Sequence, residues 1–75
     1  MTLTGAQTRE ARRLVGWTLS QLSGRVGLST ANIALFESGE RQLSFFDVSV
    51  IRHALEAAGI EFDDKGHGVR MREEK

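Results

Sequence analysis

Cysteine is missing altogether from this 75-residue chain, so neither disulfides nor a thiolate metal site can add to its stability. Long apolar runs are missing too, and no stretch approaches the roughly 20 apolar residues of a membrane span. The opening residues, Met1–Gly5, lack the basic start of a signal peptide. From these absences we expect a cytoplasmic protein that does not associate with a membrane.

An excess of charge of either sign is also absent. Ten lysines and arginines balance ten aspartates and glutamates, which gives a formal net charge of zero. A protein dedicated to nucleic acids usually carries a basic excess or a basic face. The balance therefore argues against a nucleic-acid partner, although it leaves room for a local basic patch.

Residue patterns typical of catalysis are scarce. His53 and His67 fall on different predicted elements, and no cysteine or carboxylate–histidine spacing joins them into a metal site. The adjacent Asp63 and Asp64 are typical of a solvated turn. We therefore predict a protein that is not an enzyme and that has no catalytic residues, cofactor, metal ion or small-molecule substrate.

What is present is the composition of an ordinary globular protein, with 40% hydrophobic and 27% charged residues. Residues 1–75 are enough for a single domain with a small core, and chains of this size are only marginally stable alone. Pairing of two copies is one way to enlarge such a core. A homodimer is therefore a candidate assembly.

Four helices are predicted from their start and stop signals, because each span begins at a serine or threonine N-cap and ends near a glycine. The spans are Thr4 to Gly16, Thr18 to Gly27, Ser29 to Gly39, and Ser44 to Gly59. Three caps are followed three residues later by a partner that predicts a capping box, namely Gln7, Gln21 and Asp47. Only Gly27 and Leu28 separate the second span from the third, which predicts a helix-turn-helix unit. The third helix should contain about nine or ten residues.

Apolar residues at helical spacing mark the face of each helix that we expect to be buried. They are Ala11, Leu14, Val15, Leu22, Val26, Leu28, Ile33, Phe36, Val48, Ile51 and Leu55. After this helical core, residues 4–59, the segments Ile60–Phe62 and Val69–Met71 read as two short strands around a turn. This hairpin, residues 60–72, must pack on the helices, pair with a second copy or remain loose, and residues 73–75 should form a frayed tail.

Several stretches of the chain agree with one pattern at once: Ala11–Leu22, Val26–Ser29, Ile33, Phe36–Arg41 and Ile51–Phe62. This pattern resembles the Xre/Cro/cI-type helix-turn-helix family, in particular its small bacterial members that end in a short β-hairpin. The resemblance implies a mainly all-α fold, with a compact four- to five-helix domain and a C-terminal hairpin, that is usually dimeric and represses transcription. It also implies a structural ion pair between Arg12 and Glu37, on the first and third helices.

The third helix departs from that family where a DNA-reading helix would meet base edges. It carries no basic residue. The side chains that a helical wheel places outward are Ala31, Ala34, Leu35 and Ser38. Only Thr30, Asn32 and Ser38 could match the donors and acceptors of base edges. Relatives commonly carry a glutamine where this chain has Leu19. The outward face is therefore unusually apolar.

Two phenylalanines follow the Ser44 cap, where relatives usually have a proline. In one interpretation Phe45 wedges against the third helix and Phe46 covers the hairpin. In the other, both belong to exposed apolar surface of the kind that marks an interface. The residues that follow each other along the outer side of the fourth helix form a candidate dimer face: Phe46, Val50, His53 and Ala57.

Two hypotheses about function remain. The one that we favour is a small transcriptional regulator that keeps the helix-turn-helix scaffold but binds protein, as an antiactivator that captures a transcription activator. Its protein-partner face would be Leu19, Ala31, Ala34, Leu35 and Phe45. The alternative is a repressor that reads a double-stranded DNA operator as a dimer. Its DNA contacts would come from Arg25, Thr30, Ala31, Asn32, Leu35 and Arg41.

Overall fold

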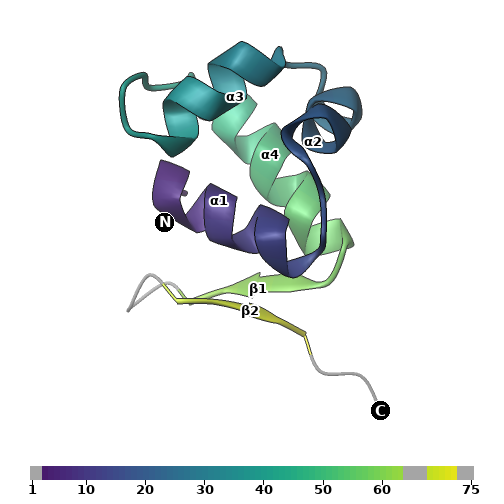
Figure 1. Ribbon diagram of the computed structural model, residues 1–75. Coiled ribbons are helices and arrows are strands. Elements are labelled where there is room, and N and C mark those ends of the chain that lie inside the picture. The colour runs from purple at the N-terminus through teal and green to yellow at the C-terminus, as the bar shows by residue number, and fades with distance from the viewer. Residues whose placement is uncertain (1–2, 64–67, 73–75) are drawn as a thin grey trace.

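The fold is mainly α-helical and ends in a short antiparallel hairpin, as the sequence predicts (Figure 1). It was obtained as a computed structural model, which describes residues 3–63 and 68–72. Within these residues the elements are α1 (Gly5–Leu14), α2 (Leu19–Val26), α3 (Thr30–Glu37), α4 (Phe45–Ala57), β1 (Ile60–Phe62) and β2 (Val69–Met71). The predicted roles of Asp64 and His67, and the predicted tail at residues 73–75, lie outside the described residues.

The helices begin at the predicted caps. Thr4 and Thr18 each form a complete capping box, in which the threonine hydroxyl accepts from the backbone N–H three residues on and the glutamine there accepts in return. At Ser44 only one half of the predicted box forms among the described residues, where the hydroxyl accepts from the Asp47 N–H at 3.1 Å. Helix α3 has eight residues, so the predicted length was slightly too long.

The connection between α2 and α3 is as tight as predicted. Gly27 closes α2 with φ of 76°, a left-handed conformation that glycine adopts without steric cost. Ser29 caps α3 by accepting from the Asn32 N–H at 3.1 Å. The Ser23 hydroxyl donates to the Leu28 carbonyl, which holds the turn against α2. Because α2 and α3 also pack on each other, the two helices form the expected helix-turn-helix unit.

The core lies between the four helices and the hairpin. Its buried apolar side chains are Leu3, Ala11, Leu22, Ile33, Phe36, Val48, Ile51, Leu55 and Ile60. The prediction was wrong for Leu14, which is 44% exposed. The buried stripe of α1 passes through Thr8 and Ala11, and Leu14 lies about 60° round the helix from Ala11, at the margin of that stripe. The sequence analysis missed Leu3, although its place just before an N-cap is a known site for an apolar contact.

The hairpin packs on the helices, which decides among the three predicted alternatives. Strands β1 and β2 pair in the register Ile60 with Met71 and Phe62 with Val69. Strand β1 contacts α4, while β2 contacts α1. Burial of Ile60 against these helices supplies the support that an isolated two-stranded hairpin lacks in water. No helix in the described residues has the length and apolar character needed to span a membrane.

Candidate functional site

Helix α3 lies at the end of the molecule opposite the hairpin, with α1 and α4 between them (Figure 1). Ile33 and Phe36, on the inner side of α3, are buried, and α1 and α2 both contact this helix. The side of α3 that faces away from these contacts is therefore presented to solvent. This outer side is where the sequence analysis placed the partner-binding residues.

A salt bridge attaches α3 to α1. The Glu37 carboxylate accepts from Nε of Arg12 at 2.9 Å and from Nη2 at 3.0 Å, and the third nitrogen, Nη1, donates to the Trp17 carbonyl at 2.9 Å. Arg9 lies on the rim, with Nε 3.6 Å from the same carboxylate. The hydrogen bond to Glu37 raises the pKa of Arg12, although partial burial acts in the opposite direction. The ion pair expected between Arg12 and Glu37 is thus present, and it joins two elements rather than facing a ligand.

The outward residues of α3 are not equally accessible. Thr30 and Ala31 are exposed, whereas Asn32, Ala34 and Leu35 are half-buried. The wheel had placed Ala34 and Leu35 outward, and it was only partly right. Beyond α3 the chain folds back, since the Leu35 carbonyl accepts from the N–H groups of residues 40 and 41 at 3.0 and 3.2 Å. This returning chain limits solvent access to the end of α3.

Arg41 reaches back to α3 from the loop that follows it. Its Nη1 donates to Oδ1 of Asn32 at 2.8 Å, a contact that the sequence analysis did not anticipate. Asn32 is the residue of α3 best suited to read adenine, and its acceptor oxygen is occupied in this arrangement. Because both groups are near solvent, the bond contributes little free energy and can be exchanged.

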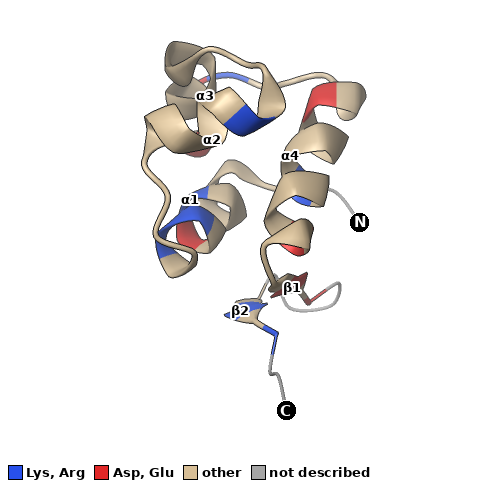
Figure 2. Cartoon of the chain, turned by 90° about the vertical axis from the view of Figure 1, so that its right-hand side faces the viewer, with Lys and Arg blue, Asp and Glu red and all other residues tan. Residues whose placement is uncertain are grey.

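The basic side chains near α3 all come from other elements. Figure 2 shows no lysine or arginine on α3 itself, in agreement with its sequence. Arg25, on α2, lies over the ring of Trp17, 4.3 Å from its centroid. The two arginines proposed for phosphate contacts, Arg25 and Arg41, therefore already have contacts within the chain. A protein that binds DNA draws most of its non-specific affinity from such groups.

The two phenylalanines at the start of α4 are largely exposed to solvent. Phe45 is 84% exposed and Phe46 is 73% exposed, so neither covers α3 or the hairpin. The interpretation in which they are packed is wrong, because the core-facing residue of this first turn is Val48 and both phenylalanines lie on other sides of the helix. Leu19, at the start of α2, is half-buried.

A shallow hollow lies beside the outer side of α4. Its lining residues are Trp17, Arg25, Val50, His53, Ala54, Ala57 and Ala58. Of the candidate dimer face, His53 and Ala57 are exposed, as is Phe46, while Val50 is half-buried. The four residues therefore lie on one accessible side of α4, as the sequence predicts.

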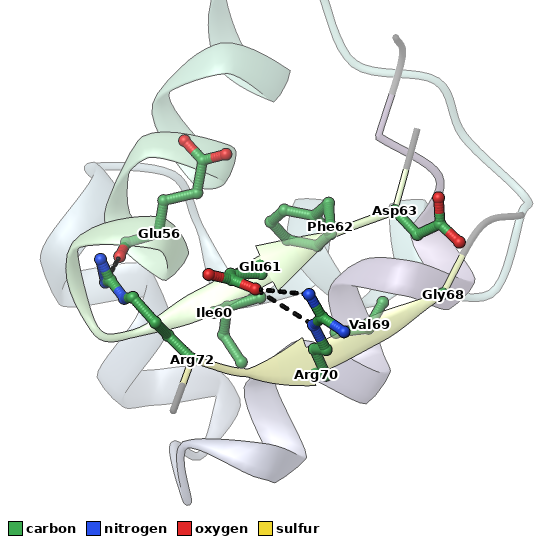
Figure 3. A pocket seen from close by; sticks show the side chains of 9 residues that line it. All are labelled: Glu56, Ile60, Glu61, Phe62, Asp63, Gly68, Val69, Arg70 and Arg72. Carbon is green, nitrogen blue, oxygen red and sulfur yellow. Dashed lines mark hydrogen bonds and ion pairs between the residues drawn. The ribbon is translucent and has the colours of Figure 1, made fainter. Parts of the chain in front are cut away.

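A second hollow runs along the hairpin, and Figure 3 shows the side chains that line it. Glu61 and Arg70 form a cross-strand ion pair with an Nη2–Oε1 distance of 3.0 Å. Arg72 donates through Nη2 to the carbonyl of Glu56 at 3.0 Å. Charges of both signs alternate along this surface, so it favours no single class of ligand. No cluster of three candidate metal ligands occurs in the described part of the chain.

No family model matches the chain, and no curated protein matches it.

Proposed function

We propose that this protein is a small cytoplasmic transcriptional regulator that binds a protein partner through the outer side of α3. The partner that we propose is a transcription activator, which the protein would hold inactive as an antiactivator. The observation that carries this proposal is the character of α3: its accessible side presents Ala31, with Ala34 and Leu35 half-buried beside it, and has no lysine or arginine.

The chemistry of such a surface suits a protein better than a nucleic acid. The centres of protein–protein interfaces are depleted in charged residues and are packed with apolar side chains. Base edges, by contrast, need hydrogen-bond donors and acceptors placed opposite them. The proposed face also includes Leu19, which is half-buried on α2, and Phe45, which is strongly exposed on α4. Exposed aromatic groups of this kind are typical anchors in interfaces.

The alternative that we retain is an operator-binding repressor of the Xre/Cro/cI type. The tight connection between α2 and α3 favours it, because that arrangement can place α3 in the major groove of DNA. Thr30, Ala31, Asn32 and Leu35 would then face the bases, and Arg25 and Arg41 would contact phosphates. For this, Arg41 would have to leave Asn32, and the base contacts would rest on very few polar groups.

Two experiments on the intact protein distinguish these functions. Gel shifts with the DNA upstream of its own gene, repeated at several salt concentrations, should give no specific complex. Capture of activators from the native host by tagged protein should recover a defined partner. A specific nanomolar complex with DNA, with an affinity that falls steeply as salt is added, would contradict the proposal and support the repressor.

A further inference from the structure

We infer that a second copy of this chain docks on the outer side of α4, with the two α4 helices antiparallel and Phe46 of each copy seated in the hollow of the other. This surface is distinct from the proposed partner face on α3. The two can therefore be tested separately.

The outer side of α4 forms a continuous stripe. Phe46, Val50, His53 and Ala57 follow each other at helical spacing, and together they lie opposite the buried residues Val48, Ile51 and Leu55. The stripe begins with a phenylalanine that is 73% exposed and ends with an exposed alanine. A single helix thus carries a large projecting group at one end and open space at the other.

Two-fold symmetry makes this stripe complementary to itself. In a symmetric dimer, each residue on one side of the axis faces its counterpart on the other side. If the axis passes α4 midway between Ile51 and Arg52, Phe46 of one copy faces Ala57 of the other, and Val50 faces His53. Each phenyl ring then meets the smallest side chain of the stripe. Because the dimer is symmetric, this one register forms the Phe46–Ala57 contact at both ends of the helix pair.

The hollow beside Ala57 has a shape and charge that suit the approaching helix. Ala54 and Ala58 are small and allow close approach, and Trp17 provides an apolar wall. In a two-fold dimer of antiparallel helices, the side of α4 that borders the hollow lies next to the same side of the other copy. Asp47 is on this side, so Asp47 of one copy lies towards Arg25 of the other. Arg25 stacks on Trp17 but makes no ion pair with any other described residue, which leaves its charge for such a contact.

These features favour a second copy over an unrelated partner, because the projecting group and the hollow that receives it belong to the same face of one chain. Helix α4 has 13 residues and is about 20 Å long, so the contact is small. Interfaces below about 1,200 Å² usually belong to weak, transient encounters. We therefore expect a reversible dimer that dissociates on dilution.

Sedimentation equilibrium over a range of concentrations tests the dimer. The wild-type mass should rise from one chain towards two, whereas Phe46→Glu should remain at one chain at every concentration. Phe45→Glu is the matched control, because it removes a neighbouring, strongly exposed phenylalanine from outside the stripe and should dimerise as the wild type does. The inference fails if the wild type stays at one chain, or if Phe45→Glu disrupts the dimer as strongly as Phe46→Glu. Circular dichroism checks that both variants remain helical.

Disulfide trapping tests the register, and the absence of native cysteine makes its outcome unambiguous. A mixture of Val50→Cys and His53→Cys proteins should cross-link to each other in preference to either variant alone, since only the mixed pair lies directly opposite in the proposed register. Equal or greater cross-linking within each single variant would reject this register. Leu35→Arg should leave the sedimentation mass equal to that of the wild type. The dimer and the partner face on α3 can therefore fail independently, because the first is tested by this mass and the second by partner capture.

Discussion

The guanidinium of Arg12 and the carboxylate of Glu37 meet through two parallel hydrogen bonds, of 2.9 and 3.0 Å, that join α1 to α3. Their side chains are only 14% and 2% exposed, so the pair is largely removed from water. A buried pair of this kind is costly to break, because the group left behind remains charged and unsatisfied. The ion pair therefore fixes the position of α3 relative to α1.

Removal of one partner should be strongly destabilising. We expect Arg12→Ala to lower the free energy of unfolding by about 3–5 kcal/mol, measured by urea denaturation. Arg70→Ala is the control, because Arg70 forms an ion pair of 3.0 Å with Glu61 while its own side chain is 80% exposed. That change should cost about 0–1 kcal/mol. Similar losses in the two variants would contradict the structural role of Arg12.

The contribution of Arg12 should not depend on pH across the neutral and moderately alkaline range. Its pKa is raised in the folded protein above the ordinary value of an arginine, chiefly by the hydrogen bond to Glu37. A raised pKa gives stability that is complete below the unfolded value and is lost only as pH rises through the folded value. Urea denaturation of the wild type and of Arg12→Ala at neutral and alkaline pH should therefore give a constant difference. A difference that shrinks within the neutral or moderately alkaline range would overturn this expectation.

Gly5 should be intolerant of any side chain. A Cβ at this position would lie 1.9 Å from the Phe36 carbonyl oxygen, because the start of α1 packs directly on the backbone of α3. We expect Gly5→Ala to cost about 1–3 kcal/mol, measured by thermal or urea denaturation. Gly24→Ala is the matched control, since Gly24 is also helical and a Cβ there meets nothing within 4 Å. It should stabilise the protein by about 0.4–1 kcal/mol.

A charge on the outer side of α3 should block partner capture. Leu35→Arg places a cation in the apolar face, where its aliphatic stem can be accommodated but its charged group opposes an apolar partner. Capture of the partner by Leu35→Arg should fall at least tenfold. Capture by Leu19→Gln should also fall, but by a smaller factor. Leu14→Arg introduces the same charge at an exposed leucine on α1, and it should bind as the wild type does. If Leu35→Arg and Leu19→Gln capture as much partner as the wild type and Leu14→Arg do, α3 is not the binding face.

The sequence was informative wherever structure depends on neighbouring residues alone. A cap such as Thr4 or Thr18 bonds to a backbone group three residues away, so the start of a helix is encoded locally. The left-handed glycine Gly27 ends α2 for the same reason. The hairpin strands followed from their alternation, with β1 and β2 at the predicted residues. The family resemblance led to Arg12 and Glu37, which periodicity alone does not pair.

The tertiary structure decided which side chains are accessible. A helical wheel gives the direction of Leu35 but neither its exposure nor the path of the loop that bonds to its carbonyl, and in the fold Leu35 is half-buried. The same loop brings Arg41 to Asn32, and the packing of the fold leaves Phe45 84% exposed. Sequence alone thus determined that α3 is a short helix that has no basic residue and that carries Ala31, Ala34 and Leu35 towards its outer side. Only packing between distant segments decided how much of that surface reaches solvent, because exposure depends on what lies beside a residue and not on the residue itself.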